Sequence, residues 1–375
     1  MKDTVFQQLL KPITKKLIDT GVQRFQSDYH CKSFNTSDHL RVLIYTHLQE
    51  IKSLRTLEIA LNNQKLVKNK VKRSTLSDAN TKRPAGCFAW ILEQLIGLLP
   101  RKKRKEVNKV TRILDSSPIQ VRGYGYEWAE QHATRHIKGL KLHTEYDVSL
   151  QSPTKIKISY PNVNDASMGQ KWPILEDTIY VFDKGYYDYN WWWSIHQKQA
   201  YFVTRLKKNA AIFIEKQSKI KGKMMILEDG LFRISNKVPR GGKRMEYAET
   251  LRRISVKREG KKPLILVTNM KDLPAEHIAN LYKARWDIEL FFKWIKQHLR
   301  IKKFLGKSMN AIKLQLITAI ITYILVYLFK RVFKDERSLY LELTWIKHHI
   351  QNIRHYPNRP PTYRYPMINR RSVQL

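Results

Sequence analysis

A single glutamate, Glu289, lies among aromatic and basic side chains in the run LYKARWDIELFFKWIKQHLR at residues 281–300. Read as one helix that turns about 100° per residue, this run brings four side chains capable of chemistry onto one arc of roughly 60°. They are Tyr282, Arg285, Glu289 and Lys296. The neighbouring stripe, expected to be buried, contains Leu281, Ile288, Phe291, Phe292, Ile295 and Leu299. Arg285 and Glu289 also have the spacing of an ordinary surface ion pair, so the helix alone leaves both interpretations open.

Two aspartates elsewhere follow short apolar segments and add further carboxylates. In VTRILDSSPIQV at 110–121, an apolar strand is expected to deliver Asp115 at its end. Residues 179–182 are apolar without alternation, which is typical of a strand covered on both faces, and they end at Asp183. An isolated acid at a strand tip is more often a turn or helix cap. With Glu289, however, the two aspartates provide the oxygen ligands that a pair of Mg²⁺ ions needs for in-line displacement at phosphorus.

The elements around these acids predict an α/β core. The runs LKLHTEYDVSL and TKIKISY read as two further strands after the first, followed by a strand, a helix and a strand. Acids on the first and fourth strands of that order are expected of a ribonuclease-H-like catalytic core. Residues 211–269 are again β-rich, with turn signals at EDG, PRGGK and REGKKP. Asp272, Pro274 and Glu276 then mark the start of a helix.

The first hundred residues predict a helical domain that precedes the core. One helix is expected to open on the cap-forming residues Thr36, Ser37 and Asp38, and another on Ser74 or Thr75, with Pro84 as a break. The chain contains 70 Lys and Arg against 32 Asp and Glu, a formal net charge of +38. Such an excess favours nucleic acid as the partner, because each phosphate that a basic side chain neutralises releases counterions. The basic runs KLVKNKVKRS and PRKKRKEVNK are candidates for phosphate contacts, although each alone is equally typical of a solvated linker.

Neither a membrane nor a secreted location is expected. The apolar run at 314–329 is shorter than the roughly 20 residues that a bilayer requires, so it predicts a helix buried in a globular core. The N-terminal residues lack the apolar core of a secretory leader. Two cysteines, Cys31 and Cys87, provide no disulfide framework, which favours a reducing cytoplasm.

Several of these motifs occur together in one protein family. The pattern Tyr282, Arg285, Glu289, Lys296 resembles the Tyr-Arg-Glu-Lys motif of bacterial insertion-sequence transposases of the DDE class, in the IS-four family. The blocks ILDSS, KGLKLHTEYD and VFDKGYYD resemble the first-acid, second-strand and second-acid regions of that family, in the same order. The resemblance spans about residues 36–330.

The resemblance implies specific roles for these residues. Asp115, Asp183 and Glu289 would ligate two Mg²⁺ ions, which Mn²⁺ can replace. Tyr282 and Arg285 would hold the phosphate near the cleaved transposon end, and Lys296 would contact DNA close by. Water would free a 3′-OH that then attacks target DNA, without a covalent protein intermediate. The protein would be a cytoplasmic, nucleoid-associated transposase that synapses the two transposon ends as a homodimer.

The implied domains are a helical DNA-binding domain at 1–108, a ribonuclease-H-like core at 109–210 and 271–335, a β-rich insertion at 211–270, and a basic C-terminal region at 336–375. Some relatives stack a flipped base on a Trp of the insertion, but this chain has no Trp between Trp193 and Trp286. Phe232 or Tyr247 is therefore the expected platform if a hairpin intermediate forms. The Trp cluster at 191–193 is expected to pack its helix on the sheet.

Three further side chains and two other functions remain open. His143 either supports the active site or fills the sheet, while Asp147 and Asp188 are supporting acids at best. The alternatives to a transposase are a structure-selective nuclease of the same fold and an inactive, transposase-derived repressor. The presence of all three acids argues against the repressor, because a protein that only binds DNA has no need of them.

Overall fold

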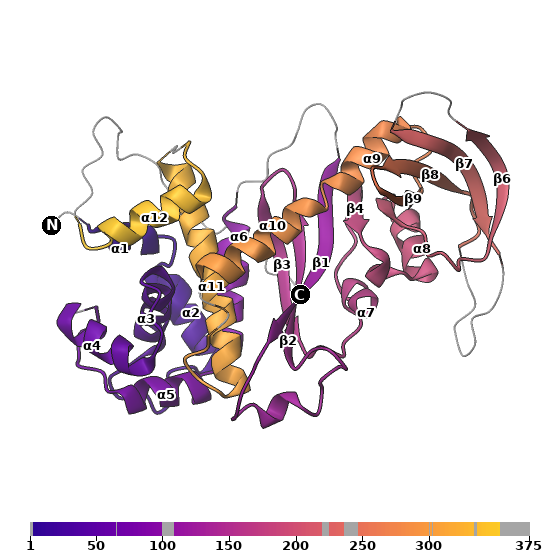
Figure 1. Cartoon of the computed structure of the whole chain (residues 1–375). Coiled ribbons are helices and arrows are strands. Elements are labelled where there is room, and N and C mark those ends of the chain that lie inside the picture. Colours follow the sequence, from indigo (N-terminus) through magenta and orange to yellow (C-terminus); the bar gives the residue numbers. More distant parts are fainter. Residues whose placement is uncertain are drawn as a thin grey trace. The chain divides into compact units, whose positions relative to one another are not determined.

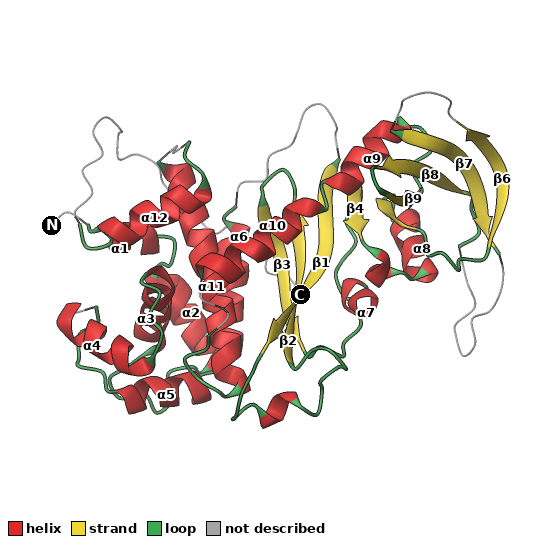
Figure 2. Ribbon diagram, in the orientation of Figure 1, coloured by secondary structure: helices red, strands yellow, loops and turns green. Residues whose placement is uncertain are grey.

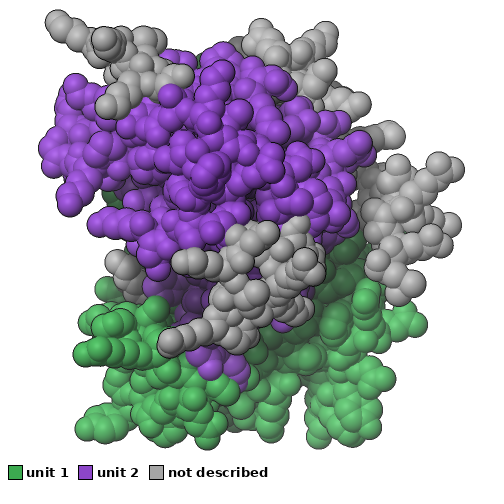
Figure 3. Space-filling view, turned by 90° about the vertical axis from the view of Figure 1, so that its right-hand side faces the viewer, with its two compact units in different colours: residues 1–100, 119–139, 292–375 green, residues 101–118, 140–291 purple. Residues whose placement is uncertain are grey.

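The computed structural model describes residues 3–64, 66–99, 109–219, 225–235, 247–299, 301, 303–333 and 336–352. The chain divides into two compact units, coloured separately in Figure 3. The first contains 1–100, 119–139 and 292–375, and the second contains 101–118 and 140–291. This division differs from the predicted domains, because 119–139 and 292–375 group with the N-terminal helices. The predicted runs at 100–109 and 355–375 lie outside the described residues, apart from Lys109.

Helices build the first unit. They are α1 (Val5–Leu10), α2 (Lys15–Phe25), α3 (Thr36–Leu48), α4 (Leu54–Gln64), α5 (Arg73–Lys82), α6 (Ala85–Gly97), the 3₁₀ helix η1 (Glu127–Ala129), α11 (Met309–Val332) and α12 (Leu339–His349). Figure 2 shows α11 as the longest helix of this group, and it packs against α3, α5 and α6. Segments from both ends of the chain therefore share one hydrophobic core.

Two of the predicted helix caps are wrong by one or two residues. The side chain of Asn35, not one of the three residues after it, caps α3 by accepting a hydrogen bond from the Asp38 amide at 2.8 Å. Helix α5 begins at Arg73, and its N-cap residue Lys72 makes no side-chain cap. Arg is a better helix former than Ser, which extends the helix and places Ser74 inside its first turn.

Helix α11 contains the apolar run that raised the question of a membrane. It is the one helix of the described residues that is long and apolar enough to cross a bilayer, yet 89% of its most apolar 18-residue window is buried inside the protein. Its Gln315 side chain accepts a hydrogen bond from the Leu305 amide and donates one to the Lys303 carbonyl. The prediction of a core helix is confirmed by this burial.

A nine-stranded mixed sheet dominates the second unit. Its strands are β1 (Val110–Gln120), β2 (Gly139–Asp147), β3 (Ser152–Ser159), β4 (Thr178–Phe182), β5 (Tyr201–Arg205), β6 (Ile212–Lys219), β7 (Ile226–Ile234), β8 (Leu251–Arg258) and β9 (Lys261–Thr268). They lie in the order β3-β2-β1-β4-β5-β9-β8-β7-β6. Figure 1 labels each of these strands except β5. Strand β4 pairs in parallel with β1 on one side and with β5 on the other. Strand β9 is antiparallel to β5, and the pairs β9–β8, β8–β7 and β7–β6 are also antiparallel.

The helices of this unit support its central strands. They are α7 (Asp165–Gly169), the 3₁₀ helix η2 (Lys184–Tyr186), α8 (Tyr189–Gln197) and α9 (Ala275–Lys283). Trp191 and Trp192 of α8 are buried against Phe182 and Phe202 of β4 and β5. The expectation that the Trp cluster packs its helix on the sheet is confirmed for these two residues.

The β-rich segment extends the sheet of the core, because β9 pairs directly with β5. The predicted turn at EDG is wrong, since Gly230 lies inside β7. A Cβ on Gly230 would lie 2.3 Å from the Lys216 carbonyl oxygen, close to an irregularity in the β6–β7 register. Glycine here permits a close backbone approach at a bulge. The turn at REGKKP is confirmed by Gly260, which joins β8 to β9 with a φ of +63°.

Residues 281–300 do not form a single helix. Helix α9 ends at Lys283 and α10 (Trp286–His298) begins three residues later. Two i→i+3 hydrogen bonds close the break, from the Arg285 amide to the Tyr282 carbonyl at 3.1 Å and from the Asp287 amide to the Ala284 carbonyl at 3.0 Å. A 3₁₀ step of this kind inside a helical run often marks a functional position. The wheel that assumed one continuous helix is therefore corrected at Arg285.

Candidate active site

Asp115 and Asp183 lie on neighbouring parallel strands. Leu114 of β1 is in register with Phe182 of β4. The residue that follows each of them is an aspartate, so Asp115 and Asp183 lie side by side. The extended conformation continues past Asp115 to Gln120, as the β-forming residues after Pro118 predict, so Asp115 lies inside β1 and not at its end. What ends after Leu114 is the pairing with β4. Asp115 and Asp183 therefore lie where the pairing between β1 and β4 ends.

Local backbone amides orient both aspartates. Oδ1 of Asp115 accepts a hydrogen bond from the Ser116 amide at 2.8 Å. Oδ1 of Asp183 accepts one from the Gly185 amide at 2.7 Å, and Asp183 thereby caps η2. Each carboxylate thus uses its Oδ1 to hold its own turn.

Arg285 connects the third acid to the first. Its Nη1 donates to Oδ2 of Asp115 at 3.1 Å, and its Nη2 donates to Glu289. Arg285 and Glu289 have the i, i+4 spacing of a surface ion pair, but the contact with Asp115 joins two segments 170 residues apart. The surface-pair interpretation is therefore insufficient, because the guanidinium bridges two of the three candidate acids.

The pKa of Asp115 reports how these charges interact. It is raised from 3.8 to about 6, chiefly by burial and to a smaller extent by the negative charges of Asp183 and Glu289. The Ser116 amide and the Arg285 guanidinium oppose that increase. A partly buried carboxylate beside two others is a place where additional positive charge is stabilising.

The donor chemistry of this cluster fits a hard divalent cation, since every candidate ligand is a carboxylate oxygen. As arranged, however, the described residues contain no group of three metal-type side chains close enough to hold one ion. The Arg285 guanidinium lies between Asp115 and Glu289, where it neutralises both. Binding of a cation by both carboxylates requires Arg285 to give up at least one of these contacts.

Tyr282 and Lys296 flank the cluster along the chain in different ways. Tyr282, near the end of α9, is buried, and the Arg285 guanidinium carbon lies 6.0 Å from the centre of its ring. Burial raises the pKa of the Tyr282 hydroxyl, while Arg285 and Arg205 lower it. Lys296 is half-buried in the last turn of α10, in the part of that helix that belongs to the first unit. The structure therefore joins Tyr282, Arg285 and Glu289 to the two aspartates within the second unit.

The expected platforms for a flipped base are wrong. Phe232 is fully buried, and Tyr247 is 4% exposed with its hydroxyl bonded to Nδ1 of His196 at 2.8 Å. Both rings belong to the hydrophobic core between α8 and the sheet. Because both rings are buried, neither has a face free for a base. Phe232 points into that core because side chains alternate between the two faces of strand β7.

Of the supporting acids, two serve local structure. Asp147 accepts hydrogen bonds from Ser149 and from the Leu150 amide in the turn after β2. Asp188 caps α8 by accepting from the Trp191 amide at 2.9 Å. An acid that the sequence analysis missed, Asp165, lies closer to the candidate site, with Oδ1 3.3 Å from Nδ1 of His143. Its position after Asn164, at the start of a short helix, has the pattern of an ordinary helix N-terminus, so no sequence signal distinguished it.

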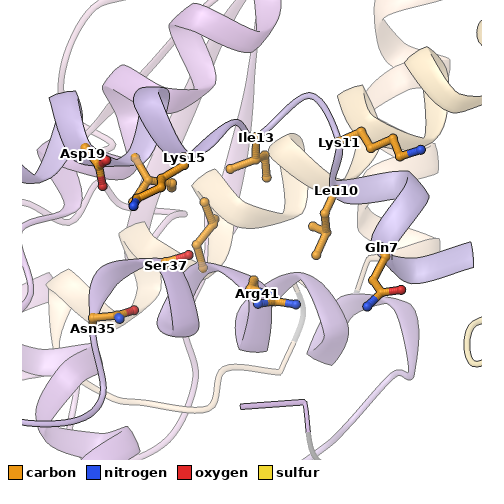
Figure 4. A pocket seen from close by; sticks show the side chains of 11 residues that line it. Gln7, Leu10, Lys11, Ile13, Lys15, Asp19, Asn35, Ser37 and Arg41 are labelled. Carbon is orange, nitrogen blue, oxygen red and sulfur yellow. The ribbon is translucent and has the colours of Figure 1, made fainter. Parts of the chain in front are cut away.

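The first unit presents several grooves with basic linings. One, of about 440 Å³, lies between the α1–α2 connection and α3, where Figure 4 shows Lys11, Lys15 and Arg41 among its lining residues. Another, of about 600 Å³, lies between α4 and α5 and is lined by Leu54, Arg55, Glu58, Lys72, Arg73, Ser74 and Ser77. Three of these seven residues are basic and one is acidic, so the second groove is complementary to a chain of phosphates.

Comparisons with known proteins agree with the chemistry of the second unit. Residues 108–325 match the family model described as "Transposase DDE domain", and residues 1–68 match a domain of unknown function, DUF4372. A protein of Sinorhizobium fredii named as a transposase, y4zB, is 40% identical over 261 residues, 68% of this chain and 71% of that protein.

Two more distant relatives are named as transposases of insertion sequence elements. The one for IS5377 from Geobacillus stearothermophilus is 26% identical over 68% of this chain and 66% of that protein. The one for IS4SA from Synechocystis is 26% identical over 68% of this chain and 71% of that protein. A cryo-EM structure of a piggyBac transposase synaptic complex with hairpin DNA aligns with 93% of this chain and 80% of its own, at a TM-score of 0.49 and 8% identity.

Proposed function

This chain belongs to the transposase DDE-domain family, and on that premise we propose that Asp115, Asp183 and Glu289 are the acids with which it cuts and joins DNA at the ends of an insertion sequence. The observation that carries the proposal is the geometry of the second unit. Two aspartates meet on adjacent parallel strands, and one arginine links the first of them to Glu289. The strand order β3-β2-β1-β4-β5 supports assigning the core to the ribonuclease-H-like plan.

The proposed reaction is a pair of phosphoryl transfers. In the first, a water oxygen bonds to phosphorus at the transposon end, the bond from phosphorus to the 3′ oxygen breaks, and that oxygen takes up a proton. In the second, the freed 3′-OH loses its proton, bonds to a target phosphorus and displaces a target 3′ oxygen. When bound, a pair of Mg²⁺ ions supplies the Lewis-acid chemistry that activates the entering oxygen and stabilises the leaving one.

The chain's own residues position the phosphate. The three carboxylates would hold the divalent pair, or Mn²⁺ in its place. Arg285 is placed to exchange a carboxylate for a phosphate oxygen, because its planar guanidinium binds either one with two parallel hydrogen bonds. Burial raises the pKa of the Tyr282 hydroxyl, so that it stays protonated and can donate a hydrogen bond to the same phosphate. Lys296, on the helix of Glu289, would contact DNA farther along. These assignments make the chain a member of the Tyr-Arg-Glu-Lys group of the IS-four family.

The helical first unit would bind the terminal inverted repeats. We assign this contact to the α4–α5 groove, whose basic residues Arg55, Lys72 and Arg73 line one surface. Two copies of the chain would then bring the two ends together as a homodimer on DNA, in the cytoplasm.

A strand-transfer assay tests the function. The full-length protein is incubated with Mg²⁺, target plasmid and duplexes that carry the element's terminal sequence, which the DNA flanking the gene provides. A transposase cleaves the ends and yields joined product. Cleavage without joining indicates a nuclease, and end binding without cleavage indicates a repressor; either result contradicts the proposal.

A further inference from the structure

The hydroxyl of Tyr186 has no hydrogen-bond partner within the described structure, although the residue is only 1% exposed. Buried polar groups in proteins are almost always satisfied, so an orphaned hydroxyl beside a candidate site requires an explanation. The ring itself is well packed, at 5.9 Å from the Phe182 ring and 6.1 Å from the Trp191 ring. Packing therefore accounts for an aromatic ring at this position but not for its oxygen.

The surroundings of Tyr186 are acidic. It is the last residue of η2, and its amide donates to the Asp183 carbonyl at 3.2 Å, which ties it to the turn of that acid. Burial raises the pKa of its hydroxyl well above the ordinary value, and the charges of Asp165, Asp115 and Asp183 raise it further. The phenol is thus a neutral hydrogen-bond donor in the turn that Asp183 caps.

Asp165 faces the same turn from α7. A Cβ built on Gly185 would lie 3.4 Å from Oδ2 of Asp165 and 2.9 Å from Oδ1 of Asp183, so the two carboxylates flank one small space. Gly185 keeps that space open because it has no side chain. The other oxygen of Asp165, Oδ1, lies 3.3 Å from Nζ of Lys141 and 3.3 Å from Nδ1 of His143.

The Nε2 atom of His143 is held by a hydrogen bond with the Ser159 hydroxyl, and the direction of this bond is known. The Ser159 hydroxyl donates its one proton to the Tyr160 carbonyl at 2.9 Å, so it can only accept from Nε2 of His143 at 2.8 Å. Nδ1 of His143 is consequently directed at Asp165. Lys141 is anchored in the same way, by a 2.8 Å hydrogen bond from Nζ to the Val163 carbonyl. Burial lowers the pKa of His143 to about 4, so the ring is neutral and its Nδ1 is an acceptor that donates no hydrogen bond to Asp165. Lys141 therefore holds Oδ1 of Asp165, and Oδ2 lies toward Gly185.

We propose that Tyr186 and Asp165 form an outer layer behind Asp115 and Asp183 that binds the water ligands of a divalent cation, Tyr186 as donor and Asp165 as acceptor. This rests on the proposed function, since it concerns the same cation. Mg²⁺ usually retains several of its waters when it binds to protein carboxylates, and those waters need both donors and acceptors. Groups of this outer kind orient the ligands and typically change metal affinity by about 10-fold to 100-fold. Tyr186 and Asp165 are thus positioning residues.

The test measures Mn²⁺ affinity rather than activity. Full-length protein is bound to a pre-cleaved end duplex, and the free Mn²⁺ is followed by its EPR signal during a titration. We expect Tyr186→Phe and Asp165→Asn each to weaken Mn²⁺ binding by about tenfold. The matched controls are Tyr187→Phe, which removes a hydroxyl bonded to Tyr189 at 2.8 Å, and Asp188→Asn at the α8 cap. Both controls should bind Mn²⁺ like the unmodified protein.

Thermal unfolding of the metal-free protein separates this role from a structural one. Tyr186→Phe should leave Tm unchanged or higher, because it removes an unpartnered polar atom and keeps the ring. A lower Tm without metal, or unchanged Mn²⁺ affinity in either Tyr186→Phe or Asp165→Asn, would overturn the proposal. If the unmodified protein cleaves ends with Mn²⁺ while Tyr186→Phe binds the ion equally well, the outer layer fails and the proposed function stands. If the unmodified protein neither binds Mn²⁺ nor cleaves, the proposed function itself fails.

Discussion

Arg285 donates a hydrogen bond to Asp115 across 3.1 Å, although 170 residues separate the two in the chain. This contact ties the step between α9 and α10 to the strand of the first candidate acid. Because Arg285 also binds Glu289, it holds together two carboxylates that would otherwise repel each other. The positive charge that the site needs is thus partly supplied by the protein itself.

Glu289→Gln should abolish Mg²⁺-dependent end cleavage while leaving end binding largely intact. The substitution keeps the size of the side chain and removes the charge of a proposed metal ligand, so we expect a loss of more than about a hundredfold, beyond the usual effect of an outer partner. Cleavage and gel-shift assays measure the two quantities. Glu276→Gln, at the start of α9, is the charge-matched control and should cleave normally. Full cleavage by Glu289→Gln would remove Glu289 from the triad.

Arg285→Lys should not be a conservative change. Lysine keeps the charge but cannot bind Asp115 and Glu289 with one planar group, and it cannot hold a phosphate through two parallel hydrogen bonds. We expect end cleavage to fall by about tenfold or more, with the effect concentrated in the cleavage rate of the bound complex. Single-turnover kinetics on saturated ends measure that rate. A rate equal to that of the unmodified protein would show that the bridging geometry has no part in the reaction.

Asp115→Asn should stabilise the metal-free protein at neutral pH. Burial, together with the charges of Asp183 and Glu289, raises the pKa of Asp115 from 3.8 to about 6. A group whose pKa is raised on folding destabilises the native state above that folded pKa, and the penalty disappears below the unfolded pKa. We therefore expect the variant to be more stable by up to about 3 kcal/mol at pH 7.5.

The difference should shrink as the pH falls through 6 and should be nearly absent below 3.8. Urea unfolding of both proteins at pH 7.5 and near pH 4 measures it. The comparison with the unmodified protein cancels the titration of other carboxylates. A stability difference that is independent of pH would contradict the raised pKa of Asp115.

Arg55→Gln together with Arg73→Gln should weaken end binding and flatten its salt dependence. If each side chain neutralises one phosphate, the slope of log Kd against log salt should decrease by about two. Fluorescence anisotropy at several salt concentrations measures the slope. Lys16→Gln together with Lys52→Gln removes the same charge from exposed positions outside the α4–α5 groove and should change the slope less. Equal slopes for the two double variants would exclude the groove as the DNA contact.

The sequence by itself determined the features that depend on local pattern. The unbroken apolar run at 179–182 specified a covered strand, and short apolar runs predicted the succession of strands along the chain from 110 to 205. Five members of the predicted stripe on α10, from Ile288 to Leu299, are buried as helical periodicity requires. The 314–329 run indicated a core helix, and the burial of α11 confirms it, although the helix itself extends to 24 residues and so is long enough to cross a bilayer.

Only the tertiary structure decided how these parts meet. Periodicity cannot show the step at Arg285, because no Gly or Pro marks it and the deciding contact is with Asp115 on a remote strand. It also cannot separate Asp165 from a helix cap, since the neighbours that give Asp165 its place, Lys141 and the η2 turn, come from other segments. Local sequence specifies which elements form, but the partners of a buried charge are set by the packing of distant elements, and the chemistry of this site lies in those partners.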